Sequence, residues 1–127
     1  MIGIFDSGLG GLTVVKEVFR QLPEYQIIYL GDTARTPYGS KSPETITRYA
    51  IEDVEFLISK GAKIIVTACN TVSSVAMDTL RKKFPEVPIF DVADPAVAAA
   101  VETSRTGRIG LIGTRATIGS AIYTKKI

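Results

Sequence analysis

The only cysteine of the chain, Cys69, stands among polar residues in the segment Thr67-Ala68-Cys69-Asn70-Thr71-Val72-Ser73. An apolar run over 62–68 precedes it and apolar residues at helical spacing follow it, so we expect Cys69 at a strand-to-helix junction, where helix-start amides favour a thiolate. A lone cysteine is often a small buried hydrophobe, but Asn70 and Thr71 are polar neighbours that such a residue would lack. A nucleophilic cysteine would normally need a histidine, and the sequence has none. A thiolate that accepts a proton needs no such partner, which indicates acid-base chemistry at carbon.

Three further segments that follow apolar runs carry polar residues and glycines. They are Asp6-Ser7-Gly8-Leu9-Gly10-Gly11-Leu12-Thr13, Gly31-Asp32-Thr33-Ala34-Arg35-Thr36-Pro37-Tyr38-Gly39-Ser40-Lys41 and Gly110-Leu111-Ile112-Gly113-Thr114-Arg115-Ala116-Thr117. Clustered glycines let the backbone approach a ligand, and amides at a helix start can hold an anion. Tyr38 could contact a small ligand if its loop closes over the strand ends, and Thr114 and Thr117 could offer hydroxyl groups to a carboxylate. Each segment alone is also compatible with a purely structural role, as a turn or a helix cap.

A dinucleotide-binding site is an alternative interpretation of the same segments. Gly8-x-Gly10 follows an apolar run, and Asp32 lies near the ~20-residue offset of an acid that binds a ribose. Thr13 stands where the third glycine of that motif should be, and no Gly-Lys-Ser/Thr of a Walker motif occurs. A nucleotide- or anion-binding module without catalytic activity therefore remains the second hypothesis.

The composition excludes several classes of active site and partner. The 127 residues have room for one domain, and 46% hydrophobic with 22% charged residues is typical of a globular protein. The absence of histidine and the single cysteine exclude a Ser-His-Asp triad, an internal disulfide and a multi-cysteine zinc site. A net charge of +2 is too small to indicate nucleic acid or an anionic membrane as a partner. With no transmembrane run or signal peptide visible, we expect a soluble protein of a reducing compartment.

Short apolar runs alternate with segments of helical periodicity along the whole chain. We expect strands over 2–5, 26–30, 62–68, 88–92 and 107–113, and helices over 12–22, 43–60, 72–84, 94–104 and 114–127. Ser42 and Asp94 are the expected N-caps of the second and fourth helices, and Gly61 is the expected glycine after the second helix. This alternation predicts an α/β fold with a doubly wound parallel sheet, helices on both faces and the site at the carboxyl ends of the strands.

Four motifs taken in order resemble the cofactor-independent glutamate racemases along the whole chain. They are Phe5-Asp6-Ser7-Gly8-Leu9-Gly10-Gly11-Leu12-Thr13, Gly31-Asp32-Thr33-Ala34-Arg35-x-Pro37-Tyr38-Gly39, Ala68-Cys69-Asn70-Thr71 and Ile112-Gly113-Thr114-x-Ala116-Thr117. The resemblance implies that Cys69 is a catalytic cysteine that exchanges the α-proton on one face of glutamate, and that Asp6 assists it. It also implies substrate contacts at or beside Asp6, Ser7, Pro37, Tyr38, Gly39, Ser40, Asn70, Thr71, Thr114 and Thr117.

The same resemblance implies a bacterial cytoplasmic enzyme that makes D-glutamate for peptidoglycan, often as a homodimer, without pyridoxal phosphate or metal. The members of the family are about twice as long, with two similar α/β domains, and the second domain supplies another catalytic cysteine. We therefore expect residues 1–94 to form most of one domain and residues 95–127 to begin the other. On this interpretation the chain lacks its C-terminal half and is inactive alone, binding neither nucleic acid nor membrane.

Overall fold

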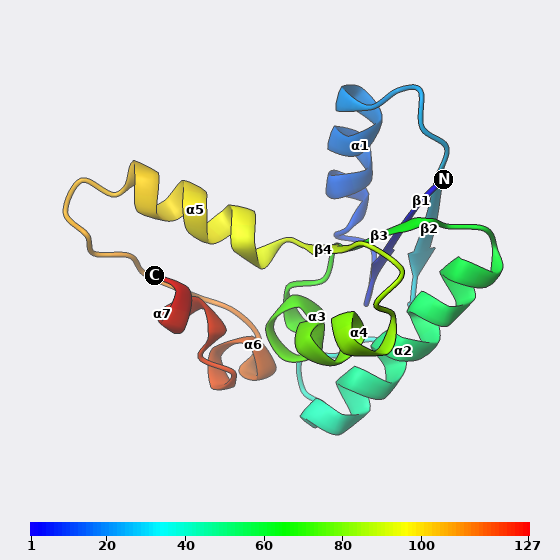
Figure 1. Ribbon diagram of the computed structural model, residues 1–127. Coiled ribbons are helices and arrows are strands. Elements are labelled where there is room, and N and C mark those ends of the chain that lie inside the picture. Colours follow the sequence, from blue (N-terminus) through cyan, green and yellow to red (C-terminus); the bar gives the residue numbers. More distant parts are fainter.

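A parallel sheet of four strands, in the order β2-β1-β3-β4, forms the centre of the computed structural model, which describes residues 1–127 (Figure 1). Its strands are β1 (Ile2–Asp6), β2 (Ile27–Gly31), β3 (Ile64–Thr67) and β4 (Ile89–Asp91). The first strand pairs with β2 on one side and β3 on the other, so the strand order reverses at β1. The predicted parallel sheet is confirmed, and its switch point lies at the ends of β1 and β3.

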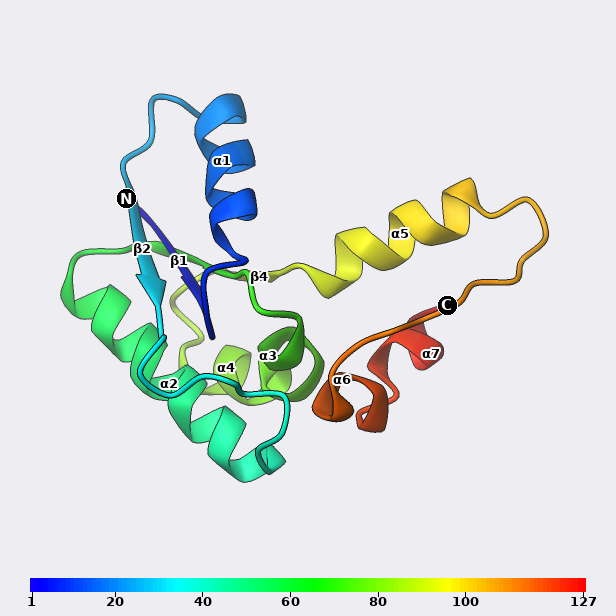
Figure 2. The same ribbon diagram turned by 180° about the vertical axis from the view of Figure 1, so that it is seen from behind.

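Helices cover both faces of the sheet, as predicted (Figure 2). One face is covered by α1 (Leu12–Gln21), and the other by α2 (Pro43–Ser59), α3 (Asn70–Val75) and α4 (Met77–Lys83). The rest of the chain forms α5 (Ala93–Thr103), α6 (Arg115–Gly119) and α7 (Ile122–Lys126). None of these helices combines the length and apolar character that a bilayer crossing requires.

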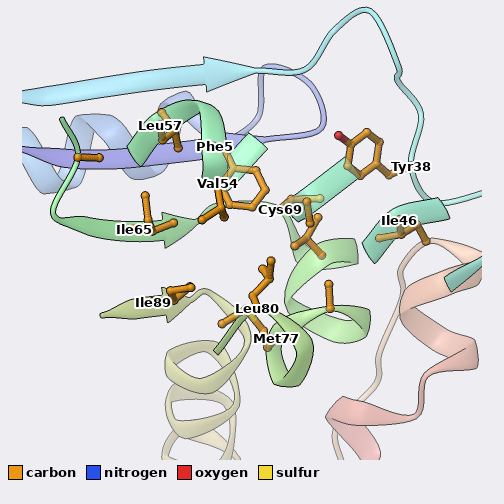
Figure 3. Close-up of a cluster of buried hydrophobic side chains, with 14 residues drawn as sticks. Phe5, Tyr38, Ile46, Val54, Leu57, Ile65, Cys69, Met77, Leu80 and Ile89 are labelled. Carbon is orange, nitrogen blue, oxygen red and sulfur yellow. The ribbon is translucent and has the colours of Figure 1, made fainter. Parts of the chain in front are cut away.

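The larger core lies between the sheet and α2, α3 and α4 (Figure 3). Apolar residues at helical spacing give α2 one buried stripe, which includes Ile46, Val54 and Leu57, all without solvent exposure. This stripe packs in one cluster with Phe5 of β1 and Ile65 of β3. Close packing against α2 therefore holds β1 and β3 in place.

The ends of α2 follow from its flanking residues. The Ser42 side chain accepts a hydrogen bond from the Thr45 amide at 3.3 Å, and Pro43 opens the helix. Gly61 adopts φ +95°, the left-handed conformation that ends a helix. Both expectations for this helix are confirmed.

Two expectations for the later helices are wrong. The helix expected over 72–84 is two helices, because the backbone at Ala76 (φ −111°, ψ −9°) departs from helical geometry. The helix expected from Asp94 begins at Ala93, and the side chain of Asp91 accepts from the amides of Ala93 at 2.8 Å and Asp94 at 2.9 Å. The cap that we expected from Asp94 is thus supplied by the last residue of β4.

The fifth strand, expected over 107–113, does not form. No residue of this segment takes part in a backbone–backbone hydrogen bond, and Ile112 is 97% exposed. The segment follows the outward-projecting α5, and no strand of the chain lies beside it (Figure 1). An apolar run becomes a strand only where another strand supplies hydrogen-bond partners. The apolar composition of this segment was therefore not enough to predict a strand.

The C-terminal helices form a second, smaller cluster beside the sheet domain. Ala93 and Val97 of α5 pack with Tyr123 of α7, and all three are buried. Thr114 caps α6 by accepting from the Thr117 amide at 3.2 Å, as predicted. The single helix expected over 114–127 is divided at Ala121, whose φ of +54° is left-handed.

Truncation of the buried stripe should destabilise the fold. Leu57→Ala removes a fully buried side chain and should lower the free energy of unfolding by about 2–5 kcal/mol in urea denaturation. Val101→Ala, at a position that is 49% exposed, should change it by less than about 0.5 kcal/mol. Equal losses in the two variants would contradict the assignment of the core.

Candidate active site

The loop after β1 is closed by the carboxylate of Asp6. Its Oδ1 accepts from the Ser7 amide at 2.8 Å and its Oδ2 accepts from the Gly11 amide at 2.9 Å. A Cβ on Gly11 would lie 2.8 Å from the Asp6 Cβ and 2.9 Å from the Ala68 Cβ, so only glycine fits there. The glycine-rich segment is thus a tight turn that fixes Asp6 and Ser7 against the end of β3.

Cys69 lies next to this loop because β1 and β3 are paired. The Ala68 amide donates to the Phe5 carbonyl at 2.8 Å, which extends the pairing to the residue before Cys69. Cys69 is the N-cap residue of α3 and is 4% exposed. Its Sγ donates to the Ser7 Oγ at 3.2 Å, across 62 positions of sequence. The sheet therefore brings together Cys69 and Ser7, two of the predicted site residues.

A pocket of about 310 Å³ opens above these residues. It is lined by Asp6, Ser7, Gly10, Thr13, Val14, Ala68, Cys69, Asn70, Thr71 and Val92. Five of the predicted site residues share this pocket, which has room for a ligand the size of an amino acid. No group of three or more acidic or cysteine side chains is arranged to hold a metal ion.

Threonine hydroxyls form a chain that leads away from the pocket. Thr71 lines the pocket, and its Oγ1 lies 3.0 Å from the Oγ1 of Thr114. Thr114 Oγ1 lies 3.0 Å from Thr117 Oγ1 in turn. The structure thus joins these three predicted residues to one another, and only Thr71 reaches the pocket wall. Asn70 is held from the other side, since the Tyr123 hydroxyl donates to its Oδ1 at 2.6 Å.

Tyr38 occupies a different position from the pocket residues. Its side chain is 1% exposed and belongs to the same buried cluster as Cys69 (Figure 3). Its hydroxyl contacts the carboxylates of Asp32 and, at 2.9 Å, Asp53. Burial and these two carboxylates raise the pKa of Tyr38 above its usual range. The side chain is thus occupied inside the protein.

The neighbours of Tyr38 also lie outside the pocket beside Cys69. Pro37 and Ser40 are exposed, whereas Gly39 is buried and its carbonyl accepts from the Ala116 amide at 3.1 Å. Substrate contact by Pro37, Tyr38, Gly39 and Ser40 therefore stays a prediction. In this structure Gly39 connects the loop to the start of α6.

Asp53 contacts the Tyr38 hydroxyl and pairs with Arg35, and neither charged residue was among the predicted site residues. The Arg35 guanidinium donates to Asp53 Oδ1 at 2.7 Å and also pairs with Asp32 and Glu52. Asp53 is 2% exposed. The sequence does contain a sign of this buried carboxyl group. Asp53 interrupts the apolar stripe of α2, seven residues after Ile46.

The acidic residue that the dinucleotide hypothesis requires already has partners inside the protein. Asp32, which would have bound a ribose, is 8% exposed and accepts from both Arg35 and Tyr38. A Cβ on Gly31 would lie 2.5 Å from the Gly8 carbonyl oxygen, so the glycine loop is packed against the end of β2. A ribose would need an open crevice at the strand ends and a carboxylate that is free to bind it, and this part of the structure offers neither.

Comparisons with known proteins identify the family of this chain. The family described as Asp/Glu/Hydantoin racemase matches residues 2–127. The chain belongs to this family. A glutamate racemase of Geobacter metallireducens is 50% identical over 126 residues, which are 99% of this chain and 46% of that protein.

Solved structures of racemases have the same fold. The glutamate racemase of Aquifex pyrophilus superposes with a TM-score of 0.95 and 51% identity, over 98% of this chain and 49% of that one. The glutamate racemase of Francisella tularensis in complex with D-glutamate superposes with a TM-score of 0.87 and 43% identity, over 98% of this chain and 46% of that one. This racemase-family chain thus spans about half the length of the curated relatives that it matches.

Gly39→Ala tests the contact between the Tyr38 loop and α6. A Cβ at this position would overlap the Thr114 Cβ and lie 2.5 Å from its Cγ2, so the variant should lose about 1–3 kcal/mol of stability in urea denaturation. Gly110→Ala is the control, because nothing lies within 4 Å of its added Cβ. Unchanged stability in Gly39→Ala would contradict the close packing of this loop.

Proposed function

We propose that this chain is the part of a glutamate racemase that carries one of its two proton-transferring cysteines. The observation that supports this most strongly is the Cys69 thiol, held 3.2 Å from Ser7 at the wall of a pocket that suits an amino acid. The glutamate racemase from Francisella tularensis, which shares this fold, has been solved in complex with D-glutamate. Glutamate is therefore the proposed substrate.

The proposed reaction inverts the α-carbon of glutamate by two proton transfers. The Cys69 thiolate takes the α-proton, so that the C–H bond breaks, an S–H bond forms and the electron pair stays on the α-carbon, delocalised into the carboxylate. A thiol on the opposite face then donates its proton to that carbon. Because this chain has one cysteine, the second thiol must come from the remainder of the protein.

The residues around Cys69 have distinct proposed roles. The Ser7 hydroxyl, which accepts from the thiol, can rotate to donate to the thiolate once the proton has left. Asp6 keeps this hydroxyl in place and presents negative charge to the substrate ammonium group. Asn70 and Thr71 line the pocket near the start of α3, where they can hold the substrate carboxylate and stabilise the charge that develops in the transition state.

The remaining site residues and the domains complete this proposal. Thr114 and Thr117 support Thr71 through their hydroxyl chain, and the loop with Pro37, Tyr38, Gly39 and Ser40 borders the substrate in the whole protein. Residues 1–94 form most of one domain and 95–127 begin a second, which is supported by the separate small cluster of α5 and α7. The whole protein is proposed to be a cytoplasmic homodimer that needs no cofactor and supplies D-glutamate for peptidoglycan.

A chimera tests the proposed activity. When this chain replaces the matching residues of the Geobacter metallireducens glutamate racemase, the chimera should convert L-glutamate to D-glutamate in a chiral chromatography assay. The 127-residue chain alone should show no conversion above background, because it supplies one thiol and the reaction needs two.

Cys69→Ala in the chimera should reduce the rate by at least about 10²–10⁴-fold, the typical contribution of a general acid or base. Ser59→Ala, at the exposed end of α2, is the matched control and should retain the activity. Enzyme-like conversion by the isolated chain, or by the Cys69→Ala chimera, would contradict the proposed function.

The exposed segment 107–113 should make the isolated chain self-associate. Ile112 is 97% exposed and Leu111 is 38% exposed, and contiguous apolar surface favours association. Sedimentation velocity should show species larger than a monomer whose fraction rises with concentration, and Ile112→Lys should reduce that fraction. A stable monomer at every concentration would count against this expectation.

A further inference from the structure

A buried polar cluster lies beneath the loop 32–41, outside the pocket beside Cys69. Its centre is the Tyr38 hydroxyl, which lies between the carboxyl groups of Asp32 and Asp53. Arg35 contacts both carboxyl groups, and it also pairs with Glu52 at the surface. The proposed racemase mechanism uses none of these ionisable groups for proton transfer, although the cluster determines where the loop sits.

The cluster needs one more proton than Tyr38 can supply. A phenol has one hydroxyl hydrogen, but the Tyr38 oxygen is within hydrogen-bonding distance of a carboxyl oxygen of Asp32 and of Asp53 Oδ2, the latter at 2.9 Å. With both carboxyl groups ionised, one of these contacts would bring two oxygen atoms together without a hydrogen between them. A hydrogen on one carboxyl group removes this conflict, since that group then donates to Tyr38 while Tyr38 donates to the other.

The surroundings assign the additional proton to Asp53. Asp53 is 2% exposed and Asp32 is 8% exposed, so ionisation costs more at Asp53. Burial is the largest cause that raises the pKa of Asp53 to about 6, and the nearby charges of Asp32 and Glu52 act in the same direction. The hydrogen bond with Tyr38 and the charge of Arg35 oppose this shift.

Aromatic and basic side chains pack on the same side of the cluster. Tyr49 packs against the Tyr38 ring with centroids 5.4 Å apart, and the guanidinium carbons of Arg35 and Arg48 lie 4.3 and 5.1 Å from the Tyr49 ring centroid. These contacts hold Arg35 beside the two carboxyl groups.

The cluster is linked to the pocket through Gly39. The residue after Tyr38 accepts from the Ala116 amide at 3.1 Å, and it packs against Thr114 so closely that a Cβ would overlap. Thr114 in turn holds Thr71, which lines the pocket, through hydroxyl groups 3.0 Å apart. A continuous series of direct contacts thus runs from Tyr38 to the pocket wall.

We propose that Asp53 is a positioning residue, whose protonated carboxyl group donates to the Tyr38 oxygen and thereby holds Gly39 and Thr114 against the pocket wall. The consequence for glutamate rests on the proposed function, but the proton on Asp53 and its effect on the loop do not. As the pH rises above 6, ionisation of Asp53 leaves a buried charge that Arg35 pairs at 2.7 Å but that still faces Asp32 and the Tyr38 oxygen, which loosens the loop.

Carbon-13 NMR of the 127-residue chain tests the proton directly. One aspartate carboxyl signal should titrate with a midpoint near pH 6, and it should be missing in Asp53→Asn, whose amide can donate to Tyr38 in the same place. Glu55→Gln, an exposed change of the same kind on the same helix, is the control and should retain that signal. A carboxyl group of Asp53 that titrates near the ordinary pKa of 3.8 would overturn the proposal.

The methyl signals of Thr114 and Thr71 test the positioning. In the unchanged chain and in Glu55→Gln they should shift with the same midpoint near pH 6, and in Asp53→Asn they should stay constant through that range. Methyl signals that stay constant while Asp53 titrates would also overturn the proposal. Neither readout uses glutamate, so an inactive chimera with an intact titration would contradict the proposed function alone.

The pH dependence of the folding equilibrium tests independently whether Asp53 is protonated. Because the pKa of Asp53 is raised in the folded state, the folded chain binds this proton more tightly than the unfolded chain, and stability is lost as the pH rises from 3.8 through 6. Relative to Asp53→Asn, the folding equilibrium constant should fall by about 10²-fold between pH 4 and pH 8. A constant ratio across this range would contradict the proposal, and Glu55→Gln should retain the fall.

Discussion

The parallel pairing of β1 with β3 is the constraint on which the site depends. It sets Phe5 opposite Thr67, so the next residues along each segment, Asp6 with Ser7 and Ala68 with Cys69, lie side by side. The hydrogen bond from the Cys69 thiol to the Ser7 hydroxyl joins segments 62 positions apart and is possible only in this register. Because a shift by one residue would reverse the direction of each side chain, the packing of Phe5 and Ile65 on α2 also protects the chemistry.

The two loops that surround the site are closed in the same way, by a carboxyl group that satisfies polar partners inside the protein. Asp6 accepts from two amides of the glycine loop, whereas Asp53 and Asp32 contact Tyr38 and Arg35 below the second loop. The structure leaves no buried side-chain nitrogen or oxygen without a hydrogen-bond partner. Because each buried polar group has a partner, the cost of removing these acidic residues from water is offset by hydrogen bonds.

Local patterns in the sequence predicted much of the fold, including the four observed strands and the limits of α2 at Ser42 and Gly61. They also placed Asp6, Ser7, Cys69, Asn70 and Thr71 at adjoining strand ends, and these residues line one pocket. The strand expected over 107–113 was wrong because strand formation depends on a partner that is distant in sequence or absent from the chain. The burial of Tyr38 escaped prediction for a similar reason, since Asp53, one of its two carboxyl partners, lies on another element.

Isotope exchange at the α-carbon of glutamate tests the role of Cys69 most directly. In D₂O, a chimera of this chain with the Geobacter metallireducens racemase should replace the α-hydrogen of both enantiomers by deuterium, as followed by proton NMR. With Cys69→Ala, one enantiomer should still exchange, through the thiol of the other half, and the other enantiomer should not. Exchange of both enantiomers at the rate of the unchanged chimera would show that Cys69 transfers no proton and would contradict the account.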